Sequence, residues 1–174
     1  METPPLPPPR GSSAYAVALV CTGNICRSPM AHVVLESRLH AAGLADRVLV
    51  TSGGTGPWHV GEPMDERAAA TLRRAGYDPS RHRARQVTGD WFTSHDLVLG
   101  MDRANMADLA AVAPDPTARE RLLAFRAFDP DAPGPDAEVP DPWFGGPEGF
   151  ADVLVTVERT ADALTAAFRH QLSR

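Results

Sequence analysis

The stretch CTGNICRSP, residues 21–29, separates a cysteine from an arginine by five residues. A loop of that length can curl so that its backbone N–H groups point at one anion, and a helix beginning at its end adds its dipole there. Such surroundings favour the thiolate of Cys21, and the Arg27 guanidinium fits two phosphate oxygens. Gly23 keeps the backbone free of a side chain, and the Ser28 hydroxyl can donate to the thiolate. The stretch therefore predicts a phosphate-binding loop with a cysteine nucleophile.

Apolar and amphipathic segments alternate around this loop. Residues 14–20 predict a buried strand that ends at the loop, and residues 28–42 predict the helix that follows it. Further strands are predicted at 48–50, 97–99 and 122–125, and further helices at 64–75, 102–112 and 150–172. This alternation predicts an α/β fold with a mostly parallel sheet, in which ligands bind at the carboxyl ends of the strands.

Composition limits the classes of protein that fit. The 174 residues suit one domain, expected at 14–174 after a disordered, proline-rich tail at 1–13. A net charge of −5 argues against general nucleic-acid binding. No apolar stretch approaches the roughly 20 residues of a membrane span. Two cysteines, Cys21 and Cys26, are too few for a disulfide scaffold, and no secretory signal is evident, so we expect a cytoplasmic protein with reduced thiols and no membrane contact.

Several motifs carry a family resemblance. CTGNICRSP, followed by Met30 and Ala31, resembles the signature of low-molecular-weight protein tyrosine phosphatases. TSGGT with Trp58, HRARQ at 82–86, MD at 101–102 and DPW at 141–143 extend the resemblance almost to the C-terminus. It implies a three-layer fold with a four-stranded parallel sheet flanked by helices. It also implies hydrolysis of phosphotyrosine in proteins through a phosphocysteine intermediate.

The general acid is expected on a loop that faces the thiolate. Five acidic residues lie between 129 and 141, and composition does not choose among them. The resemblance chooses Asp141, because the family's acid lies in a D-P-aromatic motif. Asp129 also precedes a proline, but Asp131 follows instead of an aromatic residue, so Asp129 ranks second.

The resemblance also implies residues that support the loop and bind substrate. Asn24, Ser52 and His82 match positions whose hydrogen bonds hold the loop; asparagine also tolerates the left-handed conformation that tight loops need. Trp58 and Trp143 match aromatic positions of a deep cleft that favours phosphotyrosine over phosphoserine. The complete set expected to bind substrate is Thr22, Gly23, Asn24, Ile25, Cys26, Ser28, Trp58, Trp143 and Phe144.

Three other functions are weighed against this one. Phosphoarginine phosphatases resemble the loop but carry threonine where this chain has Ile25. A thioredoxin-linked arsenate reductase needs two further cysteines, and none follows Cys26. A non-catalytic phosphotyrosine-binding module would lack the nucleophile, arginine or acid, whereas candidates for all three are present.

Cys26 is the second cysteine of the phosphate loop. In the family, a cysteine placed like Cys26 can form a reversible disulfide with the nucleophile, which would protect it from overoxidation. Six arginines between residues 67 and 85 form a solvated face or a docking surface for acidic phosphoproteins. No metal or cofactor is expected, and we expect a monomer or weak dimer.

Overall fold

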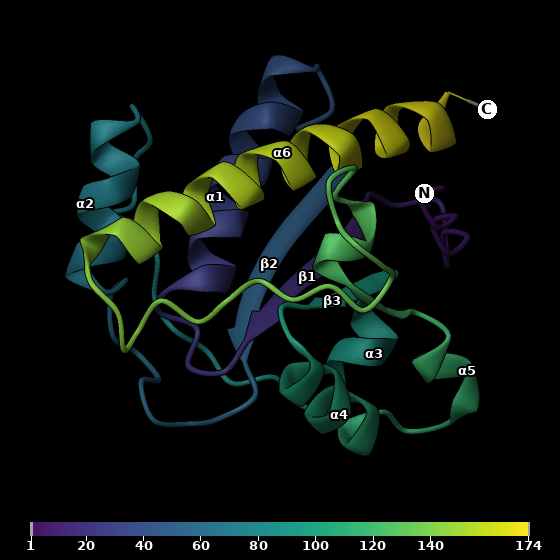
Figure 1. Cartoon of the computed structure of the whole chain (residues 1–174). Helices are drawn as coiled ribbons and strands as arrows, with labels where there is room; N and C mark the ends of the chain where they lie inside the picture. The colour runs from purple at the N-terminus through teal and green to yellow at the C-terminus, as the bar shows by residue number, and fades with distance from the viewer. Residues whose placement is uncertain (1, 174) are drawn as a thin grey trace.

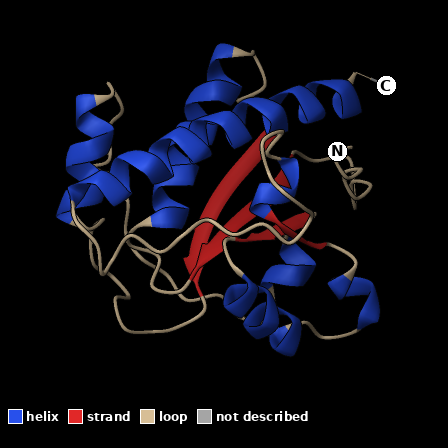
Figure 2. Cartoon of the chain, in the orientation of Figure 1, coloured by secondary structure: helices blue, strands red, loops and turns tan. Residues whose placement is uncertain are grey.

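A four-stranded parallel sheet forms the centre of the computed structural model, which describes residues 2–173. Its strands are β1 (Tyr15–Cys21), β2 (Val48–Gly54), β3 (Leu97–Gly100) and β4 (Leu122–Ala124), arranged in the order β2-β1-β3-β4. Helices lie on both faces of the sheet (Figure 1), and Figure 2 shows the strands enclosed between them. The predicted three-layer α/β fold is confirmed.

The two faces of the sheet carry different sets of helices. Helices α1 (Arg27–Ala41) and α6 (Pro147–Leu172) cover one face, and α2 (Glu66–Arg74) packs beside α6. The other face carries α3 (Trp91–Ser94), α4 (Arg103–Val112) and α5 (Pro116–Arg119). Side chains of β1 alternate between the two cores, with Val17 and Leu19 in the larger and Ala18 and Val20 in the smaller. No helix within residues 2–173 is both long and apolar enough to cross a membrane.

Local chemistry explains where most elements begin and end. Gly43 has φ 73° and lies just beyond α1, a conformation that glycine adopts without strain. Pro147 begins α6, where its missing N–H costs no hydrogen bond. The predicted strand at 122–125 is one residue shorter, because Phe125 begins the 3-10 helix η1 (Phe125–Phe128). Helices α3 and α5 were not predicted, since four residues are too few for a helical pattern to appear.

The proline-rich N-terminal segment packs against the domain, which differs from the expected disordered tail. Leu6 is buried in the larger core, and the Tyr15 hydroxyl donates to the Pro7 carbonyl at 2.9 Å. The Arg10 backbone N–H donates to Asp96 Oδ1 at 2.7 Å, and its guanidinium donates to the Phe92 carbonyl at 2.6 Å. Composition misses this packing because one leucine and one arginine, rather than an apolar stripe, hold the segment.

Candidate active site

The loop between β1 and α1 lies at the carboxyl edge of the sheet. Cys21 ends β1 and Arg27 begins α1, so the chain passes from the strand to the helix within the five residues between them. Asn24 makes the turn with φ 57°, the one left-handed residue other than glycine in the described chain. Gly54 of the neighbouring strand lies so close that a Cβ there would sit 2.7 Å from the Thr22 carbonyl oxygen. The loop is therefore shaped by its own sequence and by the backbone of β2.

The Cys21 sulfur lies within a small hydrogen-bonded network. Its Sγ is 3.1 Å from Ser28 Oγ, and Asn24 Nδ2 donates to the same hydroxyl at 2.8 Å. Because the Asn24 amide donates to Ser28 Oγ, the Ser28 proton can point at the sulfur or at the Gly53 carbonyl, which is 3.4 Å away. Cys21, Asn24 and Ser28 are all buried. The geometry is that of a hydroxyl positioned to stabilise a sulfur anion.

Arg27 is buried and held by groups far away in the sequence. Its Nη1 donates to Asp102 Oδ2 at 2.6 Å and to the Val139 carbonyl at 3.0 Å. Burial works against the charged form, but the Cys21 sulfur and the hydrogen bond to Asp102 raise the pKa of Arg27 above its usual value. A cation fixed at the mouth of the loop is suited to an anionic ligand.

Two further segments brace Asn24. His82 Nε2 lies 2.6 Å from the Asn24 carbonyl, and the Arg85 backbone N–H donates to Asn24 Oδ1 at 2.9 Å. Burial lowers the pKa of His82 to about 4, so the ring is neutral at pH 7. Since a carbonyl oxygen only accepts, Nε2 carries the ring proton. The structure thus brings His82 to the phosphate loop.

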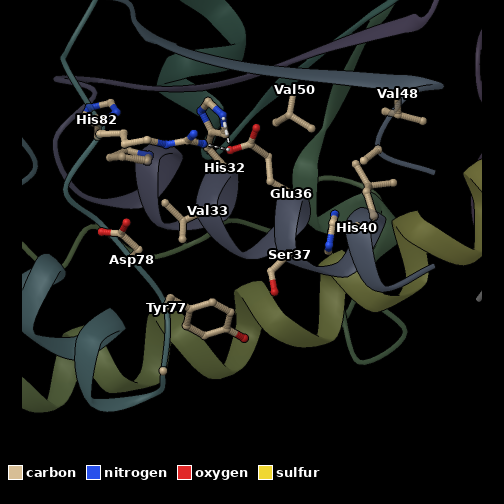
Figure 3. Close-up of a pocket in the computed structure, with 15 residues that line it drawn as sticks. His32, Val33, Glu36, Ser37, His40, Val48, Val50, Tyr77, Asp78 and His82 are labelled. Carbon is tan, nitrogen blue, oxygen red and sulfur yellow. Dashed lines mark ion pairs between the residues drawn. The ribbon is translucent and has the colours of Figure 1, made fainter. Parts of the chain in front are cut away.

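Ser52 lies next to the helix that begins in the phosphate loop. Its hydroxyl lies 3.2 Å from His32 Nδ1 on α1, and the other ring nitrogen of His32 pairs with Glu36 at 3.0 Å. His32, Glu36 and His82 line a cavity of about 800 Å³ beside α1 (Figure 3). Ser52 therefore contacts α1 through His32.

A smaller cavity of about 350 Å³ opens directly over Cys21. Asp141 lines it, with Oδ2 3.6 Å from Arg27 Nη2 and Oδ1 accepting the Trp143 backbone N–H at 3.1 Å. The Asp141 side chain is 41% exposed. The cavity is lined by Cys21, Thr22, Gly23, Ile25, Cys26, Arg27, Trp58, His59, Asp141, Trp143 and Phe144. The structure thus brings the expected nucleophile, arginine and acid to one cavity.

Asp129, ranked second as the acid, lies away from this cavity. Its side chain is fully buried and accepts hydrogen bonds from Arg159 Nε at 2.6 Å and Arg126 Nε at 2.9 Å. Burial alone would raise the pKa of Asp129, but the hydrogen bonds from Arg159, the Asp131 backbone and Arg126 lower it to about 2. Its role is structural, since both oxygens are taken up by arginine.

Exposed aromatic rings form the rim of the cavity. Phe144 is 91% exposed and Trp58 is 69% exposed, which is unusual for such large apolar side chains. The Arg67 guanidinium lies 5.2 Å from the Trp143 ring centroid and donates to the Trp143 carbonyl at 3.2 Å. The rim suits a flat aromatic ligand.

Four residues of this site were not expected there from the sequence. His59 lines the cavity, Arg67 holds Trp143, and Asp102 binds Arg27. Asn105 is fully buried, and its Nδ2 donates to Thr22 Oγ1 at 3.0 Å while its Oδ1 has no partner in the described chain. The MD motif contained Asp102, but no pattern shows that α4 reaches the loop.

Cys26 lines the cavity as a free, buried thiol, like Cys21. Burial raises the pKa of Cys26, so its thiol is protonated at neutral pH. Its redox role stays a prediction.

Among residues 2–173, no group of three His, Cys, Asp or Glu side chains is arranged to hold a metal ion.

Comparison with known proteins places these features in a family. A family model described as low molecular weight phosphotyrosine protein phosphatase matches residues 16–174. The low molecular weight protein-tyrosine-phosphatase of Streptomyces coelicolor is 43% identical over 158 residues, covering 91% of this chain and 96% of the relative. Low molecular weight protein-tyrosine phosphatase A of Mycobacterium tuberculosis is 44% identical, covering 94% and 97%. The crystal structure of YfkJ from Bacillus subtilis superposes with a TM-score of 0.84 at 30% identity, covering 93% and 98%.

Proposed function

The chain belongs to the low molecular weight phosphotyrosine protein phosphatase family, and we propose that it hydrolyses phosphotyrosine in proteins through a phosphocysteine intermediate. One observation carries the mechanism: the Cys21 sulfur, the buried Arg27 guanidinium and the Asp141 carboxyl converge on one cavity of about 350 Å³. These groups meet the three needs of the reaction, which are a nucleophile, charge neutralisation and a proton for the leaving group.

In the first step, the Cys21 thiolate attacks phosphorus and the bond to the tyrosine oxygen breaks. Arg27 binds phosphate oxygens, and Asp102 keeps its guanidinium in place with a 2.6 Å contact. Asp141, in its protonated form, donates its proton to the tyrosine oxygen as it leaves. The products of this step are free tyrosine in the protein and a phosphorylated Cys21.

In the second step, water attacks the phosphocysteine while Asp141 takes up its proton. The S–P bond breaks, inorganic phosphate leaves and the Cys21 thiolate returns. Ser28 Oγ, 3.1 Å from the sulfur, donates a hydrogen bond that makes the thiolate a better leaving group. No cofactor enters this cycle.

The rim supports phosphotyrosine as the substrate. Trp58, Trp143 and Phe144 surround the entrance with aromatic surface, against which the ring of phosphotyrosine can pack. The short side chain of phosphoserine would not span this rim. Ile25 lines the cavity as an apolar residue, which favours an aromatic ring over the charged guanidino group of phosphoarginine.

The test compares one peptide sequence carrying phosphotyrosine, phosphoserine or phosphoarginine, with wild type and with Cys21→Ser. We expect turnover of phosphotyrosine by wild type, much slower turnover of the other two, and loss of about 10⁴-fold or more in Cys21→Ser. Faster release of phosphate from phosphoarginine would overturn the substrate, and undiminished turnover by Cys21→Ser would overturn the nucleophile.

A further inference from the structure

Three arginines form a row on the surface next to the phosphate loop. Arg81, Arg83 and Arg85 alternate with His82 and Ala84 in a non-helical segment, and all three are exposed while Ala84 is buried. Their side chains have different neighbours, since Arg81 lies near Glu36 of α1 and Arg85 lies over the Trp91 ring of α3. We call these three residues the arginine ridge.

Two contacts anchor the ridge to the phosphate loop. His82 and the Arg85 backbone N–H both bond to Asn24, at 2.6 and 2.9 Å. The Gly54 N–H donates to the Arg85 carbonyl at 2.8 Å, and Gly54 in turn touches the backbone of Thr22 and Asn24. The segment that carries the ridge is therefore hydrogen-bonded directly to the loop that surrounds Cys21.

The ridge also lies against the segment that carries Trp58. The Ala84 N–H donates to the Glu62 carbonyl, and the Gly61 N–H donates to the Ala84 carbonyl, both at 2.9 Å. Residues 57–62 thus run beside the ridge and then reach the rim of the cavity through Trp58 and His59. A substrate segment that leaves the cavity across residues 57–62 meets the arginine ridge.

Arg83 and Arg85 have no carboxylate within 4.0 Å in the described chain, unlike Arg38, Arg126 and Arg159, which each pair with one or more acidic residues. Arg81 is partly neutralised, because Glu36 lies 4.0 Å away. Asp78 also interacts with Arg81, and Glu62, the one acidic side chain of residues 57–62, pairs with His59. The ridge is thus a local positive surface on a chain of net charge −5.

The two unpaired guanidiniums are held in place. Arg83 Nη1 donates to the His82 carbonyl at 2.6 Å, and the Arg85 guanidinium lies 5.4 Å from the Trp91 ring centroid. A guanidinium that is already positioned loses less conformational entropy when an anion binds. We propose that the ridge binds aspartate or glutamate side chains flanking the phosphotyrosine, so that acidic substrates are preferred. This inference rests on the proposed phosphatase function and specifies its substrates.

The test uses two phosphotyrosine peptides that differ only in their flanks, glutamates in one and glutamines in the other. The readout is the ratio of kcat/KM for the two peptides within each variant, so a general loss of activity cancels. We expect wild type to prefer the acidic peptide about fivefold at low salt, and the preference to fade near 1 M salt. We expect Arg83→Gln/Arg85→Gln to abolish it.

Arg73→Gln/Arg74→Gln is the matched control. These arginines are also exposed, but they lie at the end of α2 away from the loop, about 10 Å along the helix from Arg67. The control should keep the preference, although it removes the same charge. An equal loss in the control, or a preference that survives in Arg83→Gln/Arg85→Gln, would overturn the ridge. No preference in wild type would do the same, whereas no turnover of either peptide would refute the phosphatase function itself.

Discussion

Two loops meet at the cavity, and they are built in opposite ways. In the phosphate loop, Cys21, Asn24, Arg27 and Ser28 are buried, and hydrogen bonds join Cys21, Asn24 and Ser28. In the loop at 140–146, the side chains of Asp141 and Phe144 are largely exposed, and Arg67 provides a cation–π contact from α2. The difference shows that the proposed anion site is part of the core, whereas the proposed acid is attached to the surface. Changes in the first loop should alter folding and activity together, and changes in the second should alter activity alone.

Replacing the proposed acid should give the largest loss of activity among the changes that leave the stability of the fold unaltered. Asp141→Asn removes the proton donor, so kcat for a phosphotyrosine peptide should fall about 10³-fold. For p-nitrophenyl phosphate the loss should be much smaller, because its leaving group is a weak base that needs no proton. Steady-state kinetics on both substrates, with a thermal melt, measure this.

Asp136→Asn serves as the control. This acidic side chain lies five residues before Asp141 in the sequence but does not line the cavity. It should leave both rates unchanged. Equal losses on the two substrates in Asp141→Asn would contradict a role in protonating the leaving group, and a marked drop in melting temperature would contradict the contrast between the loops.

Replacing the other aspartate of a DP pair should give the reverse pattern. Asp129→Asn leaves Arg126 and Arg159 without their buried carboxylate, so the free energy of unfolding should fall by about 3 kcal/mol. Activity of the folded variant should change little, because Asp129 does not line the cavity. Urea denaturation followed by fluorescence measures the loss.

The pH dependence of that loss provides a second check. The folded-state pKa of Asp129 is about 2, below its value of about 4 in the unfolded chain. Its contribution to stability is therefore present above pH 4 and is lost as pH falls through 2. The difference between wild type and Asp129→Asn should shrink over this window, and a difference that grows with acidity would refute the assignment.

A smaller effect is expected at Asn105, which supports the phosphate loop from α4. Asn105→Ala frees the Thr22 hydroxyl, which also lies 3.4 Å from Arg27 Nη2, so kcat/KM should fall about tenfold. Stability should change by less than about 1 kcal/mol, because the variant also removes an unpartnered buried oxygen.

Thr22→Val removes the other partner of this hydrogen bond. The double variant should be no slower than the slower of the two single variants, as expected for residues that act as a unit. Fully additive losses in kcat/KM would show that Asn105 does not act through Thr22.

The sequence predicts best where the determinants are local. The apolar strand, the C-x5-R loop and the helix after it are consecutive, so β1, Cys21, Arg27 and α1 could be predicted together. Composition could not distinguish Asp129 from Asp141, because the difference arises from Arg159, which pairs with Asp129 across 30 positions. Asp102 and Asn105 were missed for the same reason, since only the packing of α4 beside the loop gives them their partners.

Rapid quenching tests whether Cys21 acts as a covalent nucleophile. Wild type is mixed with a phosphotyrosine peptide, quenched in acid within the first turnovers and analysed by mass spectrometry. We predict one phosphoryl group on the Cys21 side chain, formed and lost at rates compatible with kcat. Steady turnover with no phosphorylated Cys21, or with the phosphoryl group on Cys26, would contradict the account.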